Sequence, residues 1–297
     1  MATFATISVD EKSSNLVNNG FDIMKDIEMS LSSYNKNARA YLLNKNLHVE
    51  NDGYFFEALS LCKKYYAATD GYFDITVGSI TKDLYRFGES QRVPTSLELQ
   101  DAKVAFNALR FNEKEAFIDD GIKVDLGGMG KGFAVDKVAE YFRSKDTIEA
   151  VISLSGDIRC LSTCKIDIQN PFLEDEKMLS FESTKSDLGI STSGNYNRYV
   201  LSTKNNHLID PKAKKPQTCF ISITLIGELS NSDLDAYATA ASVMPIKTAY
   251  EFLDVLGVGY IIMQSDEEIV ISKNITKYAK NLLFGDTLKK QPRDIEQ

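Results

Sequence analysis

Apolar residues recur along the chain with two different periods, so the sequence predicts both helices and strands. Helical spacing is found in residues 15–34, 54–71, 232–244 and 246–256, and in a segment that ends near Arg143. Alternating or short apolar runs predict strands in residues 3–9, 149–160, 165–169, 187–203, 219–227, 258–264 and 267–274. Several of these strands adjoin as hairpins. We therefore expect an α+β fold with mixed, mainly antiparallel sheets packed against helices, rather than a doubly wound parallel sheet.

Turn and cap residues mark the ends of several of these predicted helices and strands. Gly71 and Gly257 follow helical segments and suit left-handed C-terminal caps. Ser232 suits the N-cap of the late helix, and residues 116–128 predict a hairpin that turns at Asp120 and Gly121.

The domain organisation follows from the length of the chain and the absence of a linker. We expect residues 1–285 to form a single domain of two intimately joined halves, with residues 286–297 as a flexible tail.

Composition narrows the class of protein. The chain has 297 residues, a net charge of −8 and 43% hydrophobic residues. This acidic balance argues against nucleic acid as a general partner. No apolar run approaches the roughly 18 residues that a membrane span requires. The N-terminus lacks a basic start and an apolar signal core, so we expect a cytoplasmic protein, or a periplasmic one if a leader has been trimmed away.

Four cysteines bear on the redox environment: Cys62, Cys160, Cys164 and Cys219. Only Cys160 and Cys164 are close in sequence, and no second pair completes a zinc site. We expect buried free thiols, which would fit a reducing compartment.

The most unusual segment is a glycine-rich loop that surrounds Lys131 and leads into a helix. Residues 127–132 contain four glycines. Gly132 stands where a P-loop has Ser or Thr, and the glycine spacing does not match a dinucleotide fingerprint. Exposed amides at a helix N-terminus and an ammonium favour a phosphate. A glycine-rich turn with a solvated lysine explains the same residues, and the loop alone does not decide between the two.

Two further groups carry possible chemistry. Asp235 and Thr239 are one turn apart on a predicted helix, where both oxygens could bind magnesium; a capping Asp and a core Thr are the structural alternative. His207, before a Pro-terminated turn, could act as a base or could simply bond locally within its loop.

Taken together, seven segments in this order resemble the ApbE family of FAD:protein FMN transferases. They are residues 1–3 (MAT), 71–78 (GYFDITVG), 125–136 (DLGGMGKGFAVD), 156–159 (GDIR), 192–196 (TSGNY), 207–211 (HLIDP) and 235–239 (DAYAT). The resemblance covers nearly the whole chain. It implies an ApbE, T-fold-like architecture.

The resemblance also implies an activity. Such enzymes use Mg²⁺ to transfer FMN from FAD to a threonine of an acceptor flavoprotein, and AMP is released. The acceptor is expected to carry a short motif of Asp, small residues and a terminal Thr. Hydrolysis of FAD to FMN and AMP, and non-catalytic FAD binding, remain alternatives.

The resemblance assigns roles to particular residues. Lys131 would contact the diphosphate, and His207 would deprotonate the acceptor threonine. The metal would be held by Gly128, Asp235 and Thr239. The FAD pocket would be lined by Met1, Tyr34, Tyr72, Phe73, Asp74, Asp125 and Ile209.

The chain departs from the family pattern at several positions. Ala2 replaces a glycine, Ser155 precedes the GDI segment, and Ala213 and Lys214 replace a common Thr-Gly pair. Ala238 stands where some members have a second carboxylate, so the resemblance implies a metal held by fewer charges. The chain shows no lipobox, which is similar to the cytoplasmic minority of the family.

Overall fold

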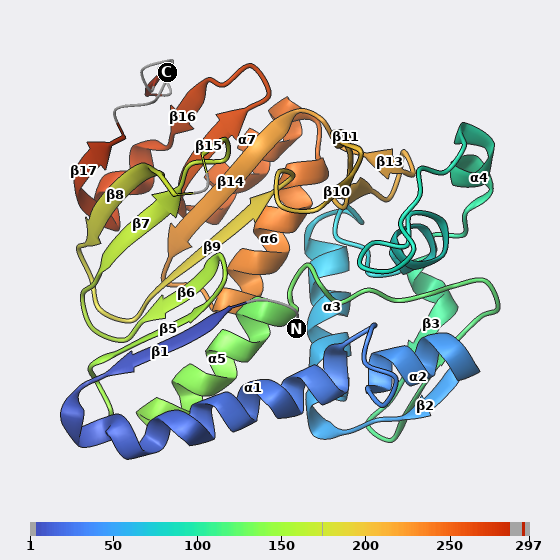
Figure 1. Cartoon of the computed structure of the whole chain (residues 1–297), viewed down its shortest axis with the longest axis horizontal. Helices are drawn as coiled ribbons and strands as arrows, with labels where there is room; N and C mark the ends of the chain where they lie inside the picture. The colour runs from blue at the N-terminus through green and yellow to red at the C-terminus, as the bar shows by residue number, and fades with distance from the viewer. Residues whose placement is uncertain (1–3, 174, 286–292, 295–297) are drawn as a thin grey trace.

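The computed structural model describes residues 4–173, 175–285 and 293–294, and it confirms the α+β class (Figure 1). Within these residues an eight-stranded sheet forms the centre of the molecule. Along the sheet its strands are β1 (Ala5–Val9), β5 (Ala150–Leu154), β6 (Asp157–Cys160), β9 (Leu188–Gly194), β14 (Phe220–Gly227), β15 (Gly259–Gln264), β16 (Ile269–Ile271) and β18 (Arg293–Asp294). Neighbouring strands are antiparallel except for the parallel pair β16 and β18.

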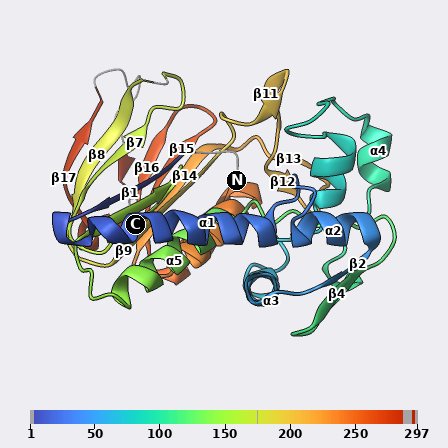
Figure 2. The same ribbon diagram turned by 60° about the horizontal axis from the view of Figure 1, so that its bottom comes forward.

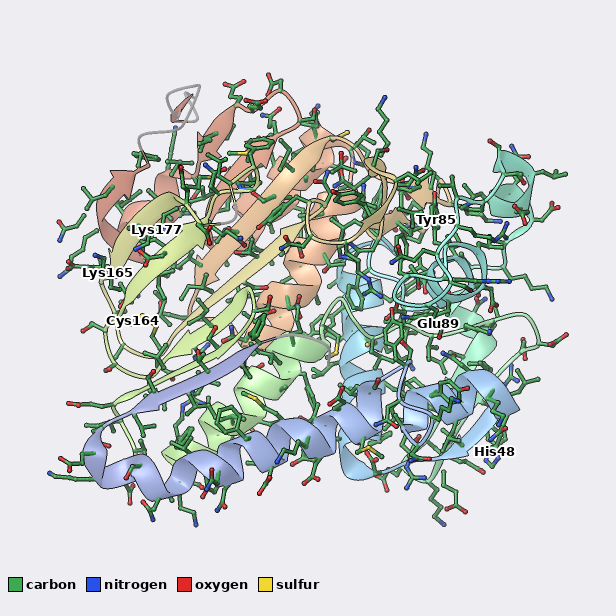
Figure 3. All side chains as sticks on the ribbon, in the orientation of Figure 1. His48, Tyr85, Glu89, Cys164, Lys165 and Lys177 are labelled. Carbon is green, nitrogen blue, oxygen red and sulfur yellow. A yellow bond between two sulfur atoms is a disulfide. The ribbon has the colours of Figure 1, made fainter. Side chains whose placement is uncertain are left out.

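The middle strands of this sheet are buried on both faces because both faces are covered. In β14, Ile223 and Leu225 join a core shared with the helices, whereas Ile226 joins a second core on the opposite face. The second core is closed by a three-stranded antiparallel sheet of β17 (Ala279–Phe284), β8 (Lys177–Ser183) and β7 (Lys165–Gln169). Exposed Lys165 and Lys177 lie on this outer sheet (Figure 3). This arrangement explains why β14 is buried along almost its whole length.

Helices cover the inner face of the main sheet. α5 (Gly130–Arg143) and α6 (Asn231–Val243) pack on it side by side, and α1 (Val17–Leu31), preceded by η1 (Glu11–Leu16), lies across α5. α7 (Ile246–Leu256) follows α6 and ends at Gly257, whose φ of 69° confirms the predicted left-handed cap.

A smaller part of the molecule lies beside the helices (Figures 1 and 2). It contains α2 (Arg39–Asn46), α3 (Gly53–Ala68), η2 (Ser79–Leu84), α4 (Ser96–Asp101), η3 (Phe106–Ala108), and the sheet β2 (His48–Glu50), β4 (Glu115–Ile118) and β3 (Leu109–Phe111). η2 is one turn of π-helix, a form often found at functional sites. η4 (Lys273–Lys277) follows β16 in the main part.

Two short hairpins connect the parts. They are β10 (Tyr199–Val200) with β11 (Ser202–Asn206), and β12 (Ile209–Asp210) with β13 (Lys215–Pro216). Val200 and Ile209 pack in a small core with Ile80, Tyr85 and Phe87, and Tyr85 lies within the smaller part (Figure 3). The loop between the hairpins, which carries His207, is therefore held against the smaller part.

Two local predictions are wrong. β4 does not form a hairpin with the chain that follows Gly121, because both edges of β4 are taken by β2 and β3. That following chain makes a single parallel bridge from Lys123 to Val77. The N-cap of α6 is Ser230, whose hydroxyl accepts from the amide of Asp233, and not Ser232.

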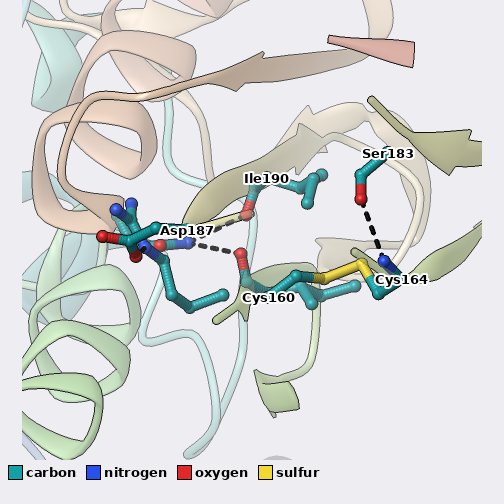
Figure 4. The surroundings of a disulfide bond; sticks show 8 residues. Cys160, Cys164, Ser183, Asp187 and Ile190 are labelled. Atoms are coloured by element: carbon teal, nitrogen blue, oxygen red, sulfur yellow. Dashed lines mark hydrogen bonds and ion pairs between the residues drawn. A yellow bond between two sulfur atoms is a disulfide. The ribbon is translucent and has the colours of Figure 1, made fainter. Parts of the chain in front are cut away.

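The expectation of free thiols is also wrong for one pair of cysteines. Cys160 at the end of β6 and Cys164 before β7 form a disulfide, because the chain brings their Cα atoms to 6.1 Å (Figure 4). Ser183 of β8 accepts a hydrogen bond from the Cys164 amide. Cys62 and Cys219 are free. Since disulfides are rare in reducing compartments, the inference of a reducing environment loses its basis.

Two further expectations concern the termini and membranes. The predicted tail, residues 286–297, lies outside the described residues except for the backbone of Arg293–Asp294 in β18. Among the helices that the structure describes, none combines the length and apolar character needed to cross a bilayer.

Candidate functional site

The candidate site lies where the N-terminus of α5 meets α6 and the start of β6. The Lys131 ammonium lies 2.6 Å from Asp157 Oδ2 and 3.1 Å from each carboxylate oxygen of Asp235. The amide of Gly132 also donates to Asp235 Oδ2, at 3.1 Å. Lys131 and Asp235, which are far apart in sequence, are thus brought into direct contact.

Two glycines allow this convergence. A Cβ on Gly132 would lie 2.1 Å from the carbonyl oxygen of Asn231, so only glycine lets α5 approach α6 this closely. A Cβ on Gly128 would lie 2.9 Å from Thr239 Cγ2 and 3.3 Å from the ring of Phe73. The glycine loop is therefore packed against α6 and is not a solvated turn.

Sequence reasoning did not assign a role to Asp157, the third member of the ionic group. Its side chain is 0% exposed and that of Asp235 is 1% exposed. Burial and then Asp235 raise the pKa of Asp157, and Ser191 donates to it at 2.6 Å. Burial lowers the pKa of Lys131, but the two carboxylates outweigh burial and the net shift is upward. The only signal in the sequence was an aspartate inside a strand segment, GDIR.

Oxygen donors suited to magnesium lie next to this group. Thr239 donates to the carbonyl of Gly128 at 3.2 Å, and its hydroxyl lies 3.2 Å from that of Ser193. Thr239 follows Asp235 by one turn of α6. Among the described residues no cluster of three or more His, Cys, Asp or Glu side chains could hold a metal. A magnesium site here would use one carboxylate, one hydroxyl and one carbonyl, with water and substrate oxygens completing the shell.

The charges of the group test whether a cation fits. Two buried carboxyl groups face one ammonium, so Lys131, Asp157 and Asp235 together carry a formal charge of −1 when both carboxyls are ionised. A divalent cation would more than neutralise this excess, and the oxygen donors are of the type that Mg²⁺ prefers. The residues present therefore fit the metal that the sequence predicts.

Asp125, at the start of the glycine loop, is fixed by several partners. It accepts from the Thr81 hydroxyl at 2.8 Å and from the Gly127 amide at 3.1 Å, and the Lys82 ammonium lies 3.0 Å from Oδ2. Burial raises the pKa of Asp125, but Lys82 and the hydrogen bonds outweigh burial and the pKa lies below its usual range. Asp125 is therefore an anchor between η2 and the loop.

His207 lies in the loop between the two short hairpins, with its Nδ1 3.1 Å from the carbonyl oxygen of Arg198. A carbonyl oxygen only accepts, so Nδ1 carries the proton and Nε2 keeps its lone pair. Burial and then the charge of Arg198 lower the pKa of His207 to about 4, while Asp125 and Lys131 also act on it. The imidazole is thus neutral at pH 7 and shares its electrostatic environment with the glycine loop.

Tyr34 and Tyr72 each lie beside a cation. The Lys82 ammonium lies 3.6 Å from the centre of the Tyr34 ring, and the Lys212 ammonium lies 4.0 Å from that of Tyr72. Each ring is therefore already in contact with a lysine ammonium and is not a free surface for stacking.

The remaining predicted pocket residues lie inside the fold. Phe73 is buried beside Gly128 and packs edge-on against Tyr65. Asp74 is buried and accepts from both the amide and the hydroxyl of Thr76, although burial still raises its pKa. Ile209 is buried in β12. Met1 lies outside the described residues.

Together these features define an α+β protein with a site where a helix N-terminus, an ammonium and oxygen donors meet, which is suited to a phosphorylated ligand and a cation. Comparisons with known proteins give this class a family. The sequence profile described as the ApbE family matches residues 1–262. The chain belongs to the ApbE family.

Individual relatives agree with this assignment. The FAD:protein FMN transferase of Haemophilus influenzae is 26% identical over 272 residues, which span 84% of this chain and 78% of that protein. The ApbE protein of Thermotoga maritima has a similar structure, with a TM-score of 0.83 at 22% identity, covering 94% of this chain and 96% of that one. Flavin transferase ApbE from Vibrio cholerae gives a TM-score of 0.79 at 21% identity over the same shares. These structures share the fold of this chain.

Proposed function

We propose that the protein is an FAD:protein FMN transferase, which moves FMN from FAD to a threonine hydroxyl of an acceptor flavoprotein and releases AMP in a Mg²⁺-dependent reaction. The names of the relatives support the flavin transfer. The observation that carries the proposal is the convergence of Lys131, Asp235, Thr239 and Gly128 at the N-terminus of α5.

The roles follow from the chemistry of these groups. Lys131 would contact the diphosphate of FAD, whereas the amides of Gly130 and Gly132 already donate to Leu126 and Asp235. The carboxylate of Asp235, the hydroxyl of Thr239 and the carbonyl of Gly128 would hold Mg²⁺. When bound, the metal would supply a Lewis acid that stabilises negative charge on phosphate oxygens.

His207 is the proposed general base. Its Nδ1 is fixed by the carbonyl of Arg198, so Nε2 is the atom that can take the proton of the acceptor threonine. A neutral imidazole at pH 7 is in the correct protonation state for this step, although a low pKa makes it a weak base.

The flavin and adenine would occupy the space around the glycine loop. Tyr34, Tyr72, Phe73, Asp74, Asp125 and Ile209, with Met1, are the proposed pocket residues. The buried positions of Phe73 and Asp74 favour a role in shaping the pocket wall over direct stacking.

The test combines the full chain, FAD, Mg²⁺ and a co-expressed candidate acceptor with a threonine motif. We expect mass spectrometry of the acceptor to show an added FMN, and AMP to appear in equal amount. Asp235→Asn should abolish transfer. Asp233→Asn, on the same helix but paired with Lys64 at 2.8 Å, is the matched control and should remain active.

Two results would contradict the proposal. AMP and free FMN without any flavin on the acceptor would indicate the hydrolase alternative. Retained transfer in Asp235→Asn would remove the assignment of the metal ligands.

A further inference from the structure

The guanidinium of Arg198 is partly buried and has no counter-ion among the described residues. Its central carbon lies 5.4 Å from the ring centre of Tyr34 and 5.6 Å from that of Phe87. It donates a long hydrogen bond, 3.4 Å, to the carbonyl of Phe87. Among the described residues no carboxylate lies within ion-pairing distance of it. Ring faces replace only part of the hydration that a partly buried cation loses.

A second cation beside the Tyr34 ring differs from Arg198 because it has a counter-ion. Lys82 also lies over Tyr34, but its ammonium is paired with Asp125. Lys82, Asp125 and Arg198 therefore carry a formal charge of +1, and that charge belongs to Arg198. An anion brought to this side of the Tyr34 ring would meet Arg198 as an unpaired partner.

Arg198 is placed next to the proposed base. The carbonyl of Arg198 accepts from His207 Nδ1, and both side chains flank the ring of Phe87, with the imidazole centre 6.4 Å from it. The positive charge of Arg198 acts on the pKa of His207, as does that of Lys131. The free guanidinium and the imidazole of His207 therefore lie against the same ring of Phe87.

Charge balance points to a phosphate. With both carboxyls ionised the group of Lys131, Asp157 and Asp235 carries −1, so with one divalent cation it would carry +1. The diphosphate of FAD carries two negative charges. Arg198 supplies the second positive charge, and a guanidinium fork matches phosphate oxygens better than a point charge does.

We propose that Arg198 binds the flavin-side phosphate of FAD, the phosphate that is transferred. This inference rests on the proposed function and deepens it. In an in-line displacement the nucleophile and the leaving group lie on opposite sides of the phosphorus. Arg198 lies beside the base that activates the nucleophile, so it faces the flavin-side phosphate and not the departing AMP.

The step balances as follows. The threonine oxygen forms a bond to the flavin-side phosphorus, and its proton passes to Nε2 of His207. The bond from that phosphorus to the bridging oxygen breaks, and AMP leaves with the electron pair. Arg198 forms no covalent bond and holds the negative charge on the transferred phosphoryl group.

The experiment measures binding by calorimetry, with Mg²⁺ and the full chain. FMN and riboflavin differ only in the phosphate, and AMP carries the other phosphate of FAD. We expect Arg198→Met to weaken FMN binding by about tenfold or more, because a hydrogen-bonded charge is lost, and to leave riboflavin and AMP binding unchanged. Arg198→Lys should recover part of the FMN affinity, since it keeps the charge and loses the fork.

Arg110→Met is the matched control, because Arg110 is exposed and paired with Asp119 at 2.8 Å, and the variant loses the same charge. Equal FMN affinity in the Arg198→Met and Arg110→Met variants would overturn the inference. A loss of riboflavin binding as large as that of FMN would also overturn it, because it would show a role in pocket shape alone. The melting temperatures of both variants show whether either has lost its fold. If Arg198→Met is unfolded, the FMN affinity of Arg198→Lys is the test.

If the wild-type chain binds neither FAD nor FMN, the proposed function itself fails. If it binds FAD and transfers FMN while Arg198→Met keeps its FMN affinity, only this inference fails.

Discussion

Replacing Lys131 by methionine removes the cation between two buried carboxylates and keeps most of the aliphatic stem. In the wild-type chain the Lys131 ammonium contacts Asp157 at 2.6 Å and Asp235 at 3.1 Å. Both carboxylates are almost fully buried, so neither can turn to water for compensation. Removing one partner of a buried ion pair usually lowers the free energy of unfolding by about 3–5 kcal/mol. We expect a loss in this range at pH 7 without metal.

The loss should depend on pH in one direction. Burial and Asp235 already raise the pKa of Asp157 above its unfolded value, so the folded state favours the protonated carboxyl. Without Lys131 this preference grows. The variant should therefore approach the stability of the wild type as the pH falls and these carboxyls take up protons, and it should be least stable at neutral and alkaline pH.

Urea unfolding followed by circular dichroism, with chelator present, measures the effect between pH 5 and 8. Lys137→Met on the same helix is the control, because Lys137 pairs with the more exposed Glu57 and Glu140. Such pairs contribute only about 0–1 kcal/mol. Equal losses for the two variants, or a loss at Lys131 that does not vary with pH, would refute the reasoning.

Three further predictions concern other parts of the chain. Reducing the Cys160–Cys164 disulfide should lower the free energy of unfolding by about 2 kcal/mol, the chain-entropy value for so short a loop, measured by denaturant unfolding with and without dithiothreitol. Gly132→Ala should destabilise the protein by at least about 2 kcal/mol, because its Cβ would lie 2.1 Å from the carbonyl oxygen of Asn231; calorimetry measures the change. His207 should keep the NMR shifts of a neutral imidazole down to about pH 5, because burial and Arg198 lower its pKa to about 4.

Each of these predictions has a control in the chain. The Cys160→Ala/Cys164→Ala variant should show no effect of dithiothreitol. Gly53→Ala should not destabilise, since nothing lies within 4 Å of its Cβ position; an equal loss at both glycines would contradict the packing argument. A His48→Gln background leaves one histidine signal, and titration of that signal near pH 6.5 would contradict the assigned environment of His207.

The long amphipathic and apolar segments were predictable from sequence because local periodicity decides them. α5, α6 and β14 bury a clear stripe or run of apolar residues, so pattern alone gave their type and approximate bounds. The short strands were not predictable in this way. β2 and β3 have three residues each, and only their tertiary pairing with β4 shows why the expected hairpin after Ile118 does not form.

The residues of the candidate site show the same difference between what local pattern predicts and what tertiary contacts decide. Lys131, Asp235 and Thr239 stood in segments with a visible pattern and a family resemblance. Asp157, Lys82 and Arg198 owe their importance to partners that are distant in sequence, and no local pattern distinguishes a buried charge from a solvated one. The disulfide is a similar case, because a CxxxC spacing does not say whether a strand end and a loop bring the two sulfur atoms together.

The central claim is that one divalent ion and one ammonium hold the diphosphate of FAD where α5 meets α6. Anomalous diffraction from a crystal grown with FAD and Mn²⁺ in place of Mg²⁺ tests it most directly. The account predicts an anomalous peak coordinated by Asp235, Thr239 and the carbonyl of Gly128, with the diphosphate beside Lys131. A peak elsewhere, or a diphosphate away from Lys131, would contradict it.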